Sequence, residues 1–207
     1  MNSVNFSSDD FPVMNAYIDS DCLNEFYETV IDHNEHYRKF SAGEFLKRSY
    51  VFSGKYLTFA GALMFGNIMR VKATLAVGAR HVAIEAVNIW EAYNDLLPRL
   101  TSKLSFRCRE KFREIFVNAL LYSDYSIDNV INITILPQPP RALIEYPGTI
   151  DSRIKNYRLQ KIFELSGIIR ANNERTHENL EQDILNFRVR ATIKLEGISQ
   201  LPLPKIL

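Results

Sequence analysis

The chain has 207 residues, of which 46% are hydrophobic, so it can bury a sizeable core and is not expected to be disordered. Its 25 Lys and Arg nearly balance its 24 Asp and Glu, which excludes an overall positive field that would hold a nucleic acid or an acidic membrane surface. The longest apolar stretch, residues 57–69, is interrupted by two glycines and an asparagine and is too short to span a bilayer.

The N-terminal sequence and the two cysteines both indicate the cellular compartment of the protein. The chain starts without the basic residues and apolar run of a secretion signal, so the sequence predicts a cytoplasmic protein. Cys22 and Cys108 lie far apart and outside any CxxC spacing, which is typical of free thiols in a reducing compartment.

The first hundred residues predict a lead-in segment followed by an α/β region. Residues 1–20 are rich in Ser, Asp and Asn and have no clear hydrophobic period, so we expect a loosely held lead-in. Residues 21–100 form the N-terminal α/β region. It begins with a helix behind an Asp N-cap, whose apolar residues fall at helical spacing: Leu23, Phe26, Tyr27, Val30 and Ile31. Residues 55–69 predict a turn and an apolar strand or buried segment, and residues 71–77 alternate as a strand.

Two long helices are predicted next. Residues 81–97 carry a broad apolar stripe that Pro98 should end. Residues 104–122 separate an apolar face from a basic one. The inward set is Phe112, Ile115, Phe116, Ala119 and Leu120, and the outward set is Arg107, Arg109, Lys111 and Arg113.

The remaining elements complete a second region over residues 101–200. Residues 130–136 and 142–146 predict two strands, separated by three prolines, that form a hairpin or lie as neighbouring strands. Helices are predicted over residues 156–169, closing at Gly167, and over residues 178–185. Residues 187–195 alternate as a last strand, and residues 201–207 form an extended tail.

One pair of polar residues could carry chemistry. Glu114 and Asn118 are spaced i, i+4, which places both side chains on one helix face. A carboxylate can polarise an attacking water, and an amide oxygen can complete the shell of a Mg²⁺ bound to a triphosphate. The same spacing is common on solvated helix faces, so that alternative stays open.

Four stretches, in order, resemble a family of bacterial transcriptional regulators. The run REIFVNALLYSDYS at residues 113–126 is similar to the family's REALVNALVHRDYS block. LTFAGALMFG at residues 57–66 and IEYPG at residues 144–148 resemble its LTNAGLLLFG and I-x-S/N-P-G segments. RLQKIFELSGII at residues 158–169 resembles its LLAxLFxxLGLI helix. These RecG-related proteins carry an AlbA-like or Schlafen-like DNA-binding domain followed by a divergent ATPase module of the GHKL class.

The resemblance implies a fold and a set of roles. The fold is α+β: a GHKL-like two-layer sandwich of helices on a mixed β-sheet, with a small N-terminal α/β extension. Glu114 would be the water-activating base and Asn118 the Mg²⁺ ligand. Asp124, Tyr125 and Gly148 match neighbouring positions of the cofactor site.

Departures from the family pattern imply a degenerate ATP site. The family's His-Arg before Asp-Tyr is Tyr122-Ser123 here, and Tyr146 replaces a small polar residue. Residues 170–176 stand where the family has a glycine phosphate loop, yet they contain no glycine, the residue that lets backbone N–H groups approach phosphates closely. The stretch that would form the ATP lid is short, and no counterpart of the AlbA-like domain is recognised. We therefore expect negligible ATP turnover.

Three other groups are open to a functional and a structural interpretation. His33 and His36 could ligate a metal, but a polar helix end is the simpler interpretation. Trp90 and Tyr93 could stack on a base, yet their spacing is that of a core face. The basic residues of the 104–122 helix could contact phosphates, but interleaved glutamates favour a solvated surface.

Two functions follow as hypotheses. The first is a regulatory module that binds ATP or ADP with Mg²⁺ weakly or not at all, with DNA contact implied by family analogy only. The second is a non-catalytic protein-interaction or dimerisation module. An irregular aromatic set should then form an exposed patch that a partner or second copy covers, unless it caps the N-terminal helix of a monomer: Phe40, Phe45, Tyr50 and Phe52.

Overall fold

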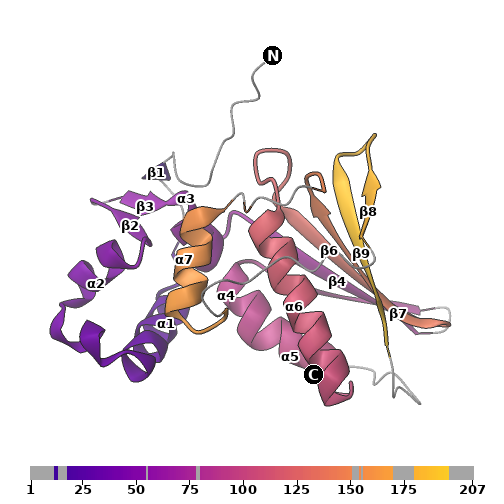
Figure 1. Ribbon diagram of the computed structural model, residues 1–207, viewed down its shortest axis with the longest axis horizontal. Coiled ribbons are helices and arrows are strands. Elements are labelled where there is room, and N and C mark those ends of the chain that lie inside the picture. Colours follow the sequence, from indigo (N-terminus) through magenta and orange to yellow (C-terminus); the bar gives the residue numbers. More distant parts are fainter. Residues whose placement is uncertain are drawn as a thin grey trace.

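The computed structural model shows an α+β protein in which helices cover one face of a six-stranded sheet (Figure 1). A smaller helical unit with a three-stranded sheet lies beside it. The two-layer arrangement of helices on a mixed sheet, predicted from the sequence, is confirmed. The structure describes residues 12–13, 18–54, 56–77, 80–150, 154, 156–169 and 180–195.

The large sheet has the strand order β5-β4-β6-β7-β9-β8. Its strands are β4 (Arg70–Val77), β5 (Arg80–Ala86), β6 (Val130–Pro137), β7 (Pro140–Pro147), β8 (Leu180–Asp183) and β9 (Arg188–Lys194). β4 and β6 are parallel and the other neighbours are antiparallel. Ile133, Ile144 and Ala191 lie in register and are buried. Successive residues of a strand point to opposite faces of the sheet. The polar residues that alternate with these buried ones along each strand therefore form the face that none of the described helices covers.

The sheet joins both regions expected from the sequence. β4 comes from residues 21–100, and it pairs with β6 from residues 101–200 through six register pairs that start at Arg70 and Val130. One hydrophobic cluster also includes residues from both regions. Strands and buried residues from both regions therefore share one sheet and one hydrophobic cluster.

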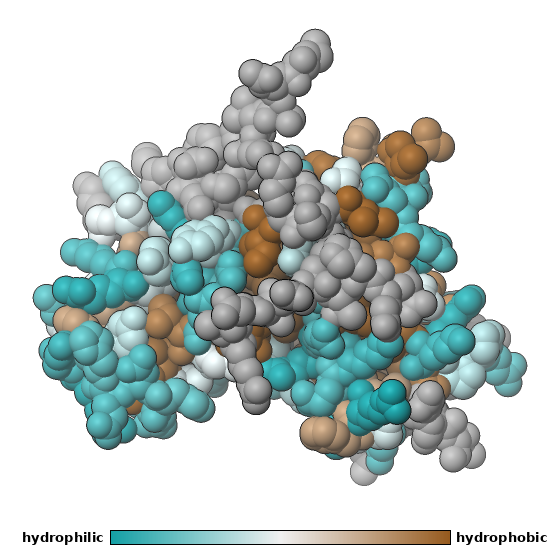
Figure 2. All heavy atoms as spheres, viewed as in Figure 1, coloured by the Kyte–Doolittle hydropathy of each residue, from teal (hydrophilic) through white to brown (hydrophobic). Residues whose placement is uncertain are grey.

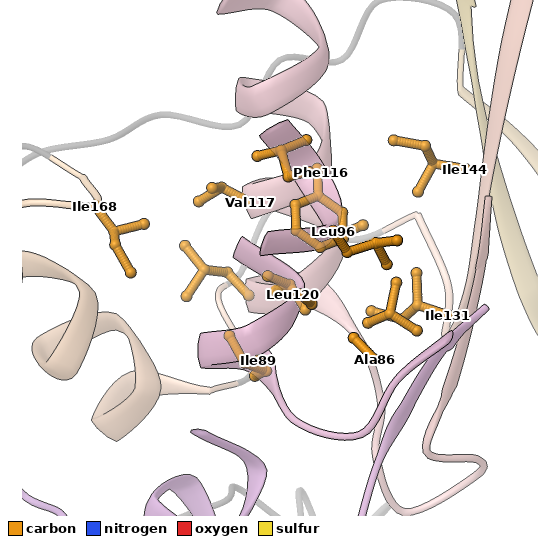
Figure 3. Packing of buried hydrophobic residues seen from close by; sticks show 14 of the residues in the cluster. Ala86, Ile89, Leu96, Phe116, Val117, Leu120, Ile131, Ile144 and Ile168 are labelled. Carbon is orange, nitrogen blue, oxygen red and sulfur yellow. The ribbon is translucent and has the colours of Figure 1, made fainter. Parts of the chain in front are cut away.

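The helix layer consists of α4 (Ile89–Glu91), a π-helical turn η2 (Ala92–Leu96), α5 (Leu97–Thr101), α6 (Phe106–Tyr122) and α7 (Tyr157–Leu165). Phe116 and Leu120 of α6 and Ile131 of the sheet belong to the core shown in Figure 3. Each fully buried side chain of this size contributes roughly 1.5–3 kcal/mol relative to exposure. The apolar face predicted for residues 104–122 is confirmed.

The smaller unit contains α1 (Ser20–His33), the 3₁₀ helix η1 (Glu35–Lys39), α2 (Ala42–Arg48), α3 (Phe59–Phe65) and the strands β1 (Pro12–Val13), β2 (Phe52–Ser53) and β3 (Tyr56–Thr58). Asp19 caps α1 by accepting hydrogen bonds from the backbone N–H groups of the first turn, as an Asp N-cap predicts. Phe26 contacts Phe65 and Trp90 at ring distances of 5.1 and 5.6 Å, which joins this unit to the main core.

The predicted helix over residues 81–97 is wrong in its first half. Residues 81–86 belong to β5, where every residue pairs with β4. The helix starts at Ile89, because Asn88 accepts a hydrogen bond from the Glu91 N–H at 2.8 Å and acts as the N-cap. Pro98 does not end this helix, since it lies in the first turn of α5, where a missing N–H is tolerated.

The predicted helix over residues 178–185 is also wrong within the described residues. Residues 180–183 form β8, paired antiparallel with β9. The Asp183 side chain accepts hydrogen bonds from the N–H groups of Leu185 and Asn186, both at 3.1 Å. This side-chain cap closes a turn and competes with a continuing helix.

The aromatic patch proposed for residues 40–52 does not form as predicted. Phe45 is fully buried beside Phe26, and Phe40 and Phe52 are half-buried. Only Tyr50 of this set reaches 40% exposure. The expected lead-in and tail, residues 1–20 and 201–207, lie largely or wholly outside the described residues. Within the described helices, none is long and apolar enough to cross a membrane.

Gly61 in α3 provides a test of how tightly α3 packs within the smaller unit. An added Cβ would lie 2.4 Å from the Val51 carbonyl oxygen, so the backbone must move. We expect Gly61→Ala to lower the free energy of unfolding by about 1–3 kcal/mol. Gly43→Ala in α2, where nothing lies within 4 Å, should instead raise it by about 0.5 kcal/mol. Urea denaturation of both variants measures this, and equal effects would contradict the close packing of α3.

Candidate functional site

Helix α6 carries both residues of the predicted catalytic pair. Glu114 and Asn118 lie one turn apart on it, as their spacing predicts. They differ in depth, because Glu114 is exposed whereas Asn118 is only 4% exposed. From Ile115 to Tyr122 every residue is buried. The helix therefore enters the core just after Glu114, and Asn118 belongs to its buried part.

Glu114 lines a cavity of about 440 Å³ between α6 and the turn that follows α7. The described lining residues are Glu110, Arg113, Glu114 and Val117 of α6 and Gly167, Ile168 and Ile169 of the turn. The resemblance groups Gly148 with Glu114, whereas the described lining of this cavity comes from α6 and the turn after α7. Asn118 and Gly148 are not among its described lining residues.

Arg113 connects the elements that form the wall of this cavity through hydrogen bonds. Its Nε donates to the Tyr93 hydroxyl at 2.5 Å and one terminal nitrogen donates to the Ile168 carbonyl oxygen at 2.8 Å. Its other terminal nitrogen lies 3.6 Å from the Glu110 carboxylate. The prediction of a solvated basic surface therefore fails at Arg113, which joins three elements. Sequence reasoning missed this role because Tyr93 and Ile168 are far away along the chain.

The charges at the cavity do not favour a bare polyphosphate. Two carboxylates, Glu110 and Glu114, face one cation among the described lining residues, and that cation is already engaged by Glu110. A triphosphate would need Mg²⁺ to offset this charge. Asn118, the expected ligand, is not among the described residues of the wall. The described lining thus fits a carboxylate beside an open cavity but does not supply a phosphate cradle.

Asp124, Tyr125 and Gly148 lie elsewhere, at the C-terminal end of α6. At 1.5 Å per residue this end is about 12 Å from Glu114. The Tyr125 hydroxyl donates to the Leu120 carbonyl oxygen at 3.0 Å, and burial raises the pKa of this phenol above its ordinary value. Tyr125 therefore stays neutral and closes the helix end.

The Asp-Tyr turn is held against the strand that ends at Pro147. The Asp124 N–H donates to the Pro147 carbonyl oxygen at 2.9 Å, and its carboxylate accepts from the Ser126 N–H at 3.2 Å. Gly148 has φ +133°, which side chains rarely adopt, and an added Cβ would lie 3.4 Å from the Tyr122 carbonyl oxygen. Local structure thus accounts for the residue types at these positions.

Asn156 is a structural residue that the sequence analysis missed. It is 3% exposed, and its amide donates to the carbonyl oxygens of Leu121 and Ser123 at 3.0 and 2.9 Å. It thereby caps the C-terminus of α6 from a distant part of the chain. The sequence places Asn156 at the start of the next predicted helix. A polar residue at such a position suggests a cap for its own helix, and nothing local indicates that it caps α6.

The other candidate groups have structural roles. Trp90 is 4% exposed and donates to the Glu25 carboxylate at 3.0 Å, so the core interpretation is confirmed. Burial and the nearby Asp19 raise the pKa of Cys22 to about 12, which keeps the thiol protonated at neutral pH. In the described part of the chain, no three His, Cys, Asp or Glu side chains are grouped to hold a metal ion.

Comparisons with known proteins place the fold. No protein-family profile matches the chain, and no curated protein matches it either. Among solved structures, the chain is similar to the DIP2311 protein from Corynebacterium diphtheriae, with a TM-score of 0.69 and 12% sequence identity. The likeness covers 92% of this chain and 40% of that one, so this chain spans less than half of its length. It establishes the α+β fold and carries no assignment of function.

The phenol of Tyr125 provides a test of the structural interpretation of the Asp-Tyr turn. Tyr125→Phe removes one buried hydrogen bond and should lower the free energy of unfolding by about 1 kcal/mol at pH 7. Since the folded state holds the pKa of Tyr125 above that of the unfolded chain, the wild type loses this stability as the pH rises above about 10. The gap between wild type and variant should therefore shrink there. Denaturant titrations at pH 7 and at alkaline pH measure it, and a gap that grows would contradict the assignment.

Proposed function

We propose that the chain is a nucleotide-binding regulatory module of the transcriptional-regulator type, with a degenerate GHKL-like site at the cavity beside Glu114. The observation that carries the proposal is this cavity, which opens between the helix with the Glu-xxx-Asn box and the turn Gly167–Ile169. Residues 170–176, which stand in place of the family's phosphate loop, follow this turn directly. The helix with the Glu-xxx-Asn box and the turn that precedes this stretch in the sequence therefore line one cavity.

The charges of the cavity support weak or lost binding and argue against hydrolysis. Two carboxylates and an engaged arginine line it, and residues 170–176, which lie outside the described residues, contain no glycine. Catalysis of phosphoryl transfer depends almost entirely on positioning and electrostatic stabilisation. A site that cannot cradle the phosphates should lose turnover before it loses all affinity. Contact with DNA rests on the family analogy alone.

A thermal shift with MgATP tests this proposal. A Kd on the order of 1 mM and about 5 mM MgATP correspond to about 1 kcal/mol of stabilisation, or about 2–4 °C in Tm for a chain of this size. We expect Glu114→Trp to remove the shift, because the bulky ring would occupy the cavity that Glu114 lines. Glu28→Trp on α1, at an exposed glutamate outside the cavity lining, should leave it unchanged.

Two results would contradict the proposal. An unchanged Tm at saturating MgATP would favour the second candidate below. Steady-state hydrolysis well above that of the Glu114→Gln variant would show that the site is an intact ATPase and not a degenerate one.

The second candidate is a non-catalytic interaction or dimerisation module, and a surface patch favours it. The turn between β8 and β9 exposes three large apolar side chains, with exposed fractions of 73% for Ile184, 90% for Leu185 and 54% for Phe187. Exposed Ile127 and Ile150 lie on segments bonded to this hairpin. Figure 2 shows apolar atoms gathered at this end of the molecule. Monomers rarely expose such contiguous patches.

Light scattering over a wide concentration range tests this candidate. We expect self-association of the wild type, weakened at least ~10-fold by Leu185→Asp, since central apolar anchors dominate interface energies. Phe106→Asp is a matched control, because Phe106 is also apolar and 72% exposed but starts α6. A strictly monomeric wild type at high concentration would exclude self-association through the hairpin.

A further inference from the structure

A second cavity of about 470 Å³ lies between the smaller helical unit and α7. Its walls come from the end of α1 and from η1, from the end of α2, and from the last turns of α7. Cavities of this size accept ligands as large as a mononucleotide. The lining residues that matter most are Tyr37, Arg48, Tyr50, Lys161 and Glu164.

Arg48 is the cation available to a ligand there. Its guanidinium lies over the Phe40 ring, with the central carbon 4.3 Å from the ring centroid. No ion pair of Arg48 with a carboxylate is found among the described residues. A guanidinium stacked on a ring keeps its N–H edge open, and this edge matches phosphate or carboxylate oxygens bidentately.

Lys161 and His33, two other basic lining residues, already have hydrogen-bond partners within the protein. Lys161 donates to the Glu164 carboxylate at 2.6 Å, so this pair is close to neutral. The Nδ1 of His33 lies 2.7 Å from the Thr29 carbonyl oxygen and therefore carries a proton, which leaves Nε2 for other contacts. The described lining thus carries a surplus of positive charge through Arg48.

Tyr50 occupies a position at which glycine is the usual residue. It follows the C-cap of α2 with φ +65°, and the N–H of Val51 donates to the Leu46 carbonyl oxygen at 3.1 Å. This is the Schellman motif, whose left-handed residue is most often glycine because a Cβ is strained there. Backbone strain at a residue other than glycine is a reason to look for a role of its side chain. The tyrosine lines the cavity beside Tyr37 and Arg48.

We propose that this cavity binds a mononucleotide-sized organic phosphate, with the Arg48 guanidinium on the phosphate and the rings of Tyr37 and Tyr50 against the planar ring of the ligand. The site is distinct from the one beside Glu114 and does not depend on it. The two cavities share Gly167 as a lining residue, so both border the turn after α7. Ligand here would contact the same turn that bounds the Glu114 cavity.

Isothermal titration with AMP in the presence of EDTA tests the proposal, because the chelator removes the Mg²⁺ on which the Glu114 site depends. We expect saturable binding that weakens at least ~10-fold in Arg48→Met, as loss of a bidentate charged contact implies. Lys47→Met is the matched control, since Lys47 is an exposed neighbouring cation that is not among the lining residues. Lys47→Met and Glu114→Trp should both bind AMP as the wild type does.

A second variant separates binding from folding. Tyr50→Gly removes the ring and the strained Cβ together, so AMP affinity should fall at least ~10-fold while Tm stays constant or rises. Adenosine without the phosphate should bind at least ~10-fold more weakly than AMP. The proposal is overturned by the lack of saturable AMP binding, by equal affinity in Arg48→Met, or by loss of binding in Glu114→Trp, a variant that fills the other cavity and would then assign AMP to it.

Discussion

The buried C-terminal end of α6 is the constraint on which the candidate site depends. A helix leaves its last carbonyl oxygens without partners in the helix, and here water cannot reach them. Tyr125 donates to Leu120, Asn156 donates to Leu121 and Ser123, and the Ser123 hydroxyl donates to Ala119 at 2.6 Å. An unpaired buried carbonyl costs roughly 1–3 kcal/mol. These side chains therefore allow the C-terminal end of α6 to be buried while Glu114, about two turns earlier, remains at the surface.

That constraint changes the meaning of the family-like motif. The Asp-Tyr-Ser block and the Pro-Gly turn resemble parts of a nucleotide site, yet in this chain they lock the helix end to β7. Only Glu114 of the five predicted site residues reaches the described wall of the cavity.

The turn at Gly167 contributes lining residues to both cavities. Arg113 donates to the Ile168 carbonyl oxygen of this turn, and Lys161 and Glu164 of α7 line the second cavity. Figure 3 shows Ile168 facing the α6 layer, so the turn is also packed into the core.

The sequence by itself determined the elements whose hydrophobic period is unambiguous: β4, β6, β7 and β9 by alternation, and α1, α6 and α7 by helical spacing. It failed at residues 81–86 and 180–183, because short amphipathic runs fit either period and their pairing with β4 and β9 decides between them. Only the tertiary structure decided that Glu114 faces a cavity while Asn118 is buried, and that Arg113 and Asn156 fasten distant segments. Those outcomes rest on contacts between residues 20 to 55 positions apart, which local sequence patterns do not encode.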